Sequence, residues 1–240
     1  MPLRFIVFLL IVTTLVVSSH GYVGWSLIAP SGLVGSARSA AWAAVVAFAM
    51  LPLLGFAGRF LVRDPAIADV LAWIGFTAMG LFSFVFVFTL LRDVVWLVMK
   101  ASSTLPGDPG RRQAFLHGSN LVLWGGSAEL TALGTLGARR RADVVDVDVP
   151  IINLPAALEG FTIAQITDLH VGPTIKKAYV DAIVDAVNEL RADVVAVTGD
   201  IVDGSVFDLS EHVAPLGRLR GKHGVFVCTG NHEYYSGAEA

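Results

Sequence analysis

Long stretches without charge dominate the N-terminal part of the chain. No Asp, Glu, Lys or Arg occurs between Arg4 and Arg38. A helix needs about 20 apolar residues to cross a lipid bilayer. Four stretches reach that length, namely Phe5–Leu27, Ser39–Gly58, Val70–Leu91 and Ala114–Ala138. A cleaved signal peptide could account for the first stretch, but not for the other three. We therefore expect a membrane domain of about four transmembrane helices over residues 1–141.

Charge divides the chain into two parts at about the same place. Residues 1–141 hold 11 Lys and Arg against 5 Asp and Glu, and residues 142–240 hold 6 against 15, so the balances are +6 and −9. Basic residues beside apolar spans are typical of membrane flanks. The acidic part could bind cations, although acidic surface is also ordinary solubilising charge. No basic patch interleaved with aromatic residues is present, which argues against a nucleic-acid partner.

After residue 142 the pattern becomes that of alternating strands and helices. Strands are expected at Val144–Ile152, Phe161–Thr167, Val194–Thr198 and Val225–Thr229. Helices are expected at Thr174–Leu190, which is amphipathic, and at Leu209–Leu219. The order strand-helix-strand-helix-strand predicts parallel strands joined by crossover helices. The fold class is therefore a multi-span helical membrane domain followed by an α/β domain over residues 142–240.

Short polar blocks follow the last three predicted strands. They are Asp168-Leu169-His170, Gly199-Asp200 and Gly230-Asn231-His232-Glu233. Because ligands bind beyond the carboxyl ends of strands in open α/β sheets, these blocks should meet at one edge of the sheet. Their spacing supports this expectation, since one strand-helix-strand step fits each of the two intervals.

The residue types in these blocks suit divalent metal ions. Asp168 and His170 are two apart, which places both side chains on one face of an extended chain. The two oxygens of the Asp200 carboxylate are enough to bridge two cations. Asn231 offers a neutral carbonyl oxygen, which leaves His232 to face a substrate. Asp203-Gly204 is interpreted as turn chemistry rather than as a ligand. The lone Cys228 excludes an intrachain disulfide.

These runs resemble the calcineurin-like metallophosphoesterase superfamily, in particular its bacterial branch with an N-terminal membrane segment. The resemblance covers about residues 144–240 and implies the N-terminal half of an αββα sandwich with two divalent metal ions (Mn, Fe, Zn or Mg). The site roles that it implies are as follows: Asp168 and His170 hold the first ion, Asp200 bridges both, Asn231 binds the second, His232 contacts the phosphate and assists the leaving group, and Glu233 supports the motif.

The resemblance is incomplete at the C-terminal end. The family pattern continues with a further His and a Gly-His-x-His block, whereas this sequence ends at Ala240. We therefore expect a fragment of a longer protein or a truncated product. The predicted function is a membrane-anchored phosphoesterase that hydrolyses a phosphoester bond, with a lipid-linked or envelope substrate. A membrane protein that binds metal or a partner without turnover is the alternative, and a transporter built on the spans, with Glu129 inside the fourth, is a third reading.

The expected location is the bacterial cell membrane. Arg111 and Arg112, just before the fourth span, resemble a twin-arginine export signal, which would place the catalytic half outside the cell. Arg139–Arg141 argue for the opposite orientation, because positive charge is enriched in cytoplasmic loops. The orientation therefore stays open, and so does the oligomeric state.

Overall fold

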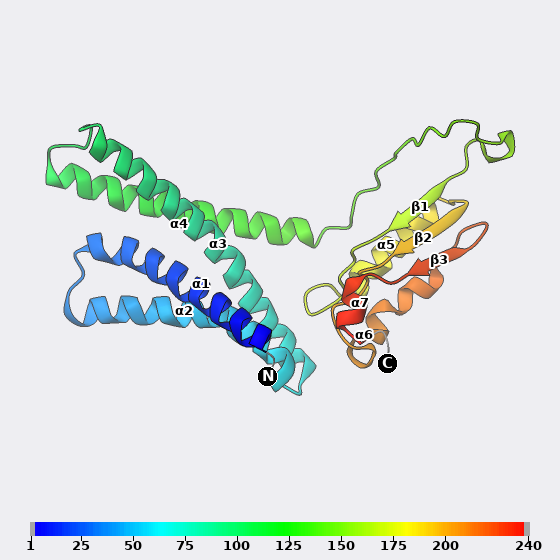
Figure 1. Cartoon of the computed structure of the whole chain (residues 1–240), viewed down its shortest axis with the longest axis horizontal. Helices are drawn as coiled ribbons and strands as arrows, with labels where there is room; N and C mark the ends of the chain where they lie inside the picture. The colour runs from blue at the N-terminus through cyan, green and yellow to red at the C-terminus, as the bar shows by residue number, and fades with distance from the viewer. Residues whose placement is uncertain (1–2, 238–240) are drawn as a thin grey trace. The chain divides into compact units, whose positions relative to one another are not determined.

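The computed structural model of this chain describes residues 3–237. It separates into two compact units, one that ends at Leu136 and one that begins at Gly137. The sequence-based division after Arg141 falls shortly beyond this boundary, in the extended segment that follows the last long helix. Figure 1 shows the elements of both units.

Four long helices make up the N-terminal unit. They are α1 (Leu3–Ile28), α2 (Gly35–Leu61), α3 (Pro65–Ala101) and α4 (Pro109–Ala138), with a short 3₁₀ turn η1 (Ala29–Ser31) after α1. Asp64 caps α3, because its side chain accepts hydrogen bonds from the backbone N–H groups of Ala66 and Ile67. Beyond Leu91 this helix continues through Arg92 and Asp93 and then through a mainly apolar run as far as Ala101.

Three of these helices are long and apolar enough to cross a membrane. Among the described residues they are Leu10–Ser31, Gly35–Gly58 and Pro65–Ala101. The fourth predicted span falls within α4, which does not belong to this group and exposes Glu129 on its surface. Multi-span helical character is therefore confirmed, and a membrane crossing by α4 stays a prediction.

Close helix contacts and a polar cluster hold this unit together. A Cβ atom added at Gly55 of α2 would lie 2.9 Å from Cα of Gly75 on α3, so only small residues allow this approach. At the other end of α3, the buried Arg92 pairs with Asp93 and donates to Ser26 on α1 and Asn120 on α4. Arg92 thus ties three helices together through one guanidinium group.

The C-terminal unit is a small α/β fold. Its elements are η2 (Ala156–Leu158), β1 (Ile163–Ile166), α5 (Lys177–Glu189), β2 (Val194–Thr198), α6 (Val206–Val213), η3 (Ala214–Arg218), β3 (Val225–Cys228) and α7 (Asn231–Tyr235). The strands pair in the order β1-β2-β3, and both pairs are parallel. The predicted α/β class and its parallel strands are confirmed, and Figure 1 shows the strands side by side.

The core of this unit lies between one face of the sheet and its helices. Ala164, Ile166, Val195 and Val197 are the buried sheet residues, and they pack with Val180, Ile183, Val184 and Val187 of α5. The predicted apolar face of α5 is confirmed at Ile183 and Val187, while Leu190 at the end of the helix is exposed. Burial alternates along β1, so only one face of the sheet packs against the helices.

One predicted strand is wrong. Residues 144–152 have no regular secondary structure, and their apolar side chains are exposed. Alternation of polar and apolar residues fits a strand, but a strand also needs a neighbour for its backbone N–H and C=O groups. Within the described part of the chain, residues 144–152 do not enter any strand pair.

Candidate metal centre

The loops after the three strands are held together by the continuing parallel register. The backbone N–H of Asp168 donates to the carbonyl of Gly199 (3.2 Å), and that of His170 donates to the carbonyl of Asp200 (3.0 Å). The loop after β3 joins through His232, whose backbone N–H donates to Oδ1 of Asp200 (3.0 Å). The three polar blocks therefore meet at the carboxyl edge of the sheet, as their spacing predicts.

Three residues of this edge adopt a left-handed backbone. The φ angles are 55° at Asp168, 47° at His170 and 51° at Asp200. This conformation costs an L-residue with a Cβ atom about 1–2 kcal/mol. Such strain persists where surrounding hydrogen bonds enforce it, and it concentrates at functional sites. The strained positions coincide with three of the predicted metal ligands.

A first group of ligand atoms comes from these three strained residues. One side-chain atom each from Asp168, His170 and Asp200 lies within 4.8 Å of the others. Nε2 of His170 is 3.7 Å from Oδ1 of Asp168. The Asp168 side chain is 60% exposed and that of His170 34%, so solvent and ligands can reach the group. Two carboxylates and one imidazole are a donor set that suits Mn, Fe, Zn or Mg.

A second group places Asp203 between two imidazole rings. Oδ1 of Asp203 lies 3.2 Å from Nδ1 of His170 and 2.5 Å from Nδ1 of His232. The two rings meet edge to face, with centroids 4.5 Å apart. A carboxylate can only accept, so each Nδ1 carries the proton and each Nε2 faces away from Asp203. His170 therefore offers Nε2 to the group with Asp168 and Asp200, and Asp203 orients the rings of His170 and His232.

The interpretation of Asp203 as a plain turn residue needs correction. Asp203 contacts His170 and His232 and belongs to a possible ligand group. The signal in the sequence is its position three residues after Asp200, within the same loop. Distance along the chain did not reveal that His170, 33 residues away from Asp203, lies beside it.

The negative charge around His170 affects its protonation. Partial burial alone lowers the pKa of an imidazole, because the charged form loses solvation. The hydrogen bond and charge of Asp203 outweigh this effect, with further contributions from Asp200 and Asp168, so the pKa of His170 is raised. The site is therefore attractive to positive charge.

Glu233 fastens the loop after β2 to the loop after β3. Its buried carboxylate accepts hydrogen bonds from the backbone N–H groups of Asp200 (2.9 Å), Ile201 (2.6 Å), Val202 (3.1 Å) and Gly230 (2.6 Å). Burial by itself raises the pKa of a carboxyl group, but these four donors outweigh it, so the pKa of Glu233 is lowered. Glu233 thus supports the site without being part of either ligand group.

Two glycines allow the loops to approach so closely. Gly199 has a φ angle of +86°, and a Cβ atom there would lie 2.7 Å from Cα of Gly230. A Cβ atom on Gly230 would lie 2.7 Å from the backbone nitrogen of Asp200. A Cβ atom does not approach other heavy atoms this closely in proteins. The backbone of the site therefore requires glycine at positions 199 and 230.

The remaining predicted residues lie in α7. Asn231 is its first residue and is exposed, next to His232, whose backbone contacts Asp200. The side chain of His232 is 37% exposed. The ligand role of the Asn231 amide stays a prediction, as do the individual roles of Asp168, His170, Asp200 and His232.

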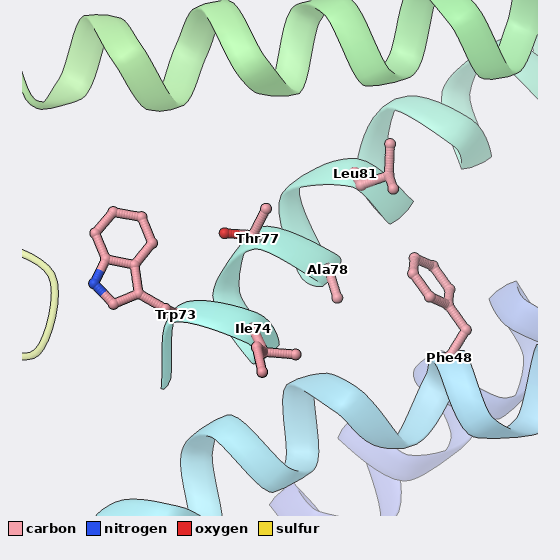
Figure 2. Close-up of a pocket in the computed structure, with 6 residues that line it drawn as sticks. All are labelled: Phe48, Trp73, Ile74, Thr77, Ala78 and Leu81. Carbon is pink, nitrogen blue, oxygen red and sulfur yellow. The ribbon is translucent and has the colours of Figure 1, made fainter. Parts of the chain in front are cut away.

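The N-terminal unit contains an apolar hollow that differs from the metal site in its lining. It lies between α2 and α3, and Figure 2 shows Phe48 on α2 across from Ala78 and Leu81 on α3. Trp73, Ile74 and Thr77 complete the lining. None of these side chains carries an ionisable group, so the hollow lacks the carboxylates and imidazoles of the site in the C-terminal unit.

Comparison with known proteins relates the C-terminal part of the chain to metallophosphoesterases. Residues 161–240 match the family model described as calcineurin-like phosphoesterase. A transmembrane protein with metallophosphoesterase domain from Danio rerio is 38% identical over 110 residues, which cover 46% of this chain and 25% of that protein. An uncharacterised metallophosphoesterase of Helicobacter pylori is 44% identical over 77 residues, 32% of this chain and 21% of its own length.

A further relative has a named substrate. A UDP-2,3-diacylglucosamine pyrophosphatase of Chlamydia trachomatis is 34% identical over 86 residues, which cover 34% of this chain and 26% of that protein. The chain therefore spans about a quarter of the length of the relatives that it matches. No solved structure matches it.

Proposed function

We propose, from the premise that residues 161–240 belong to the calcineurin-like phosphoesterase family, that this chain carries part of a membrane-anchored, metal-dependent phosphoester hydrolase. The observation that carries the proposal is the convergence of Asp168, His170 and Asp200 within 4.8 Å on a strained backbone. Three candidate membrane spans precede this site in the same polypeptide, which supports the anchored character.

The residues present fit divalent cations. Asp168, His170 and Asp200 would hold one ion, and Asp200 with Asn231 would contribute to a second. Oxygen and imidazole donors without thiolate favour Mn, Fe, Zn or Mg. The chemistry that such cations supply is Lewis acidity, which activates water as a nucleophile and offsets negative charge on phosphoryl oxygens.

The protein groups around the ligands support proton transfer and orientation. Asp203 holds Nδ1 of His170, so that Nε2 of His170 faces the carboxylates of the first group. Asp203 also holds Nδ1 of His232, and Nε2 of His232 is then directed away from it. In this position His232 can pass a proton to the leaving oxygen while the bond between that oxygen and phosphorus breaks.

A lipid-linked or envelope phosphoester is the substrate class that the membrane context favours. The relative from Chlamydia trachomatis is named for a substrate with acyl chains, and another relative is named a transmembrane protein. An enzyme held at a membrane meets such substrates at high local concentration.

Asp200→Asn tests the proposal in the complete polypeptide that carries this sequence. The wild type should hydrolyse 4-nitrophenyl phosphate with Mn²⁺, and the variant should lose at least a hundredfold in kcat, because an amide offers one oxygen where the carboxylate offers two. Asp185→Asn makes the same chemical change at an exposed carboxylate on α5 and should leave turnover unchanged. Equal turnover in both variants would refute the role of Asp200.

Calorimetric titration with Mn²⁺ distinguishes the hydrolase from the alternative, a membrane protein that binds metal or a partner without turnover. A protein that binds metal or a partner without turnover would still bind Mn²⁺ in the wild type and lose that binding in Asp200→Asn, yet release no nitrophenol in either form. Binding together with turnover supports the hydrolase.

A further inference from the structure

Exposed apolar side chains lie three to four residues after the two partners of the Asp203–His232 hydrogen bond. Val206 and Phe207 come three and four residues after Asp203, and they are 84% and 93% exposed. Tyr235 comes three residues after His232 and is 79% exposed. Single exposed apolar residues are ordinary, but here two begin α6 shortly after Asp203, and the third lies on α7, the helix that carries His232. A 2.5 Å contact joins Asp203 to His232.

The backbone fixes the positions of these side chains. Ser205 caps α6 by accepting a hydrogen bond from the backbone N–H of Asp208, and its hydroxyl donates to the Asp208 carboxylate (2.7 Å). Leu209, one turn further on, is buried in the core of the unit. Val206 and Phe207 therefore stand on an anchored helix end rather than on a loose loop.

Tyr235 lies beside the proposed proton donor. Its ring centroid is 5.7 Å from that of His232, with the two rings inclined at 66°. Residues three apart on a helix share a face, so Tyr235 is on the same side of α7 as His232. A group that leaves with a proton from His232 departs next to this phenol ring.

We propose that Val206, Phe207 and Tyr235 form an apolar rim that binds a bulky apolar group on the leaving oxygen of the phosphoester. This inference rests on the proposed function and narrows its substrate class to esters of long-chain or aromatic alcohols. The oxygen of a water molecule bonds to phosphorus while the bond from phosphorus to the leaving oxygen breaks. The leaving oxygen takes up one proton, which the water replaces, and departs as the apolar alcohol. Small polar alcohols would gain nothing from the rim.

A series of monoalkyl phosphates measures the effect. A methylene that leaves water completely improves binding about fourfold, and a half-covered one about twofold. Between butyl and octyl phosphate, kcat/KM of the wild type with Mn²⁺ should therefore rise on the order of tenfold, mainly through KM. Phenyl and 2-naphthyl phosphate form a second arm, in which the naphthyl ester should be favoured if the natural group is aromatic.

Two rim variants and one matched control complete the experiment. Val206→Ser/Phe207→Ser and Tyr235→Ser should each reduce the octyl-to-butyl or naphthyl-to-phenyl ratio at least threefold. Ile163→Ser removes a side chain that is 64% exposed at the amino end of β1, opposite the site, and should keep both ratios. Flat ratios in the wild type, or ratios that the rim variants do not change, would overturn the rim and leave the hydrolase proposal standing.

Binding supplies a readout that does not need turnover. Calorimetry with butyl- and octylphosphonate on the protein loaded with Mn²⁺ should show the same preference for the longer chain and the same loss in the rim variants. Tighter binding of octylphosphonate without hydrolysis of any ester would support the rim while refuting the proposed function. Equal binding of both phosphonates would overturn the rim.

Discussion

Replacing Glu233 by Gln should open the site locally. Oε1 of Glu233 accepts from the N–H groups of Ile201 and Val202, and Oε2 accepts from those of Asp200 and Gly230. A glutamine amide keeps one oxygen and turns an NH₂ group toward the other two donors. Two charge-assisted hydrogen bonds are lost, each worth about 1.5–3 kcal/mol. The closed arrangement of the two loops should therefore lose about 4 kcal/mol, within a combined range of about 3–6 kcal/mol.

Amide hydrogen exchange followed by mass spectrometry measures this loss. Loops open independently of the rest of a fold, so the effect appears as faster exchange of the amides at residues 200–202 and 230. A loss of about 4 kcal/mol corresponds to exchange on the order of a thousand times faster, unless another opening route already dominates. Glu211→Gln is the matched control, because Glu211 is an exposed carboxylate on α6 in the same unit.

The pH dependence of the same amides provides a second check. The folded-state pKa of Glu233 lies below its ordinary value of 4.5. A depressed pKa contributes stability that is complete above 4.5 and is lost as the pH falls through the lower, folded-state value. Faster loop opening at acid pH should thus occur in the wild type and be absent from Glu233→Gln. Unchanged protection in Glu233→Gln at neutral pH, or equal loss in Glu211→Gln, would refute the clamp.

Two further predictions concern ion pairs away from the site. Arg92→Leu leaves Asp93 without its cation, although Tyr22 and Ser26 still donate to it, and should cost the N-terminal unit about 3 kcal/mol, measured as a lower melting temperature in detergent. Arg92→Lys should not restore this stability, because lysine lacks the guanidinium fork, and a wild-type melting temperature in Arg92→Leu would contradict the argument. Asp193 has its pKa lowered to about 2 by Lys222 and by the backbone and hydroxyl of Thr162, so it stabilises the fold above pH 3.8 and stops doing so as the pH falls through about 2. Urea midpoints of wild type and Asp193→Asn should therefore differ at pH 5 and converge near pH 2, and a constant difference would exclude this assignment.

The sequence was sufficient where local pattern and chain order carry the information. Val194–Thr198 is the second strand as predicted, because a short apolar run bounded by Gly199 leaves few alternatives. The meeting of Asp168 with Asp200 follows from parallel order alone, since carboxyl ends of adjacent strands share an edge. The role of Asp203 was missed because it depends on a contact with His170 across two loops, which spacing does not encode.

Residues 144–152 are a case in which the local sequence pattern gave the wrong secondary structure. Their alternation fits a strand, yet a strand exists only with a neighbour, and the described residues do not pair with this segment. The third apolar stretch, predicted to end at Leu91, continues as helix to Ala101 past the buried Arg92, which pairs with Asp93. Whether residues 144–152 form a strand depends on a tertiary partner, and the linear pattern does not contain that partner.

The electrostatics of the site give the strongest physical reason to expect a cation. Asp168, Asp200 and Asp203 bring three carboxylates around His170, and the backbone of Asp168 and Asp200 is strained as well. Like charges at such distances repel, and the raised pKa of His170 reflects their combined field. A divalent cation reverses the sign of that field, so the arrangement that is costly for the protein alone becomes favourable when the ion binds.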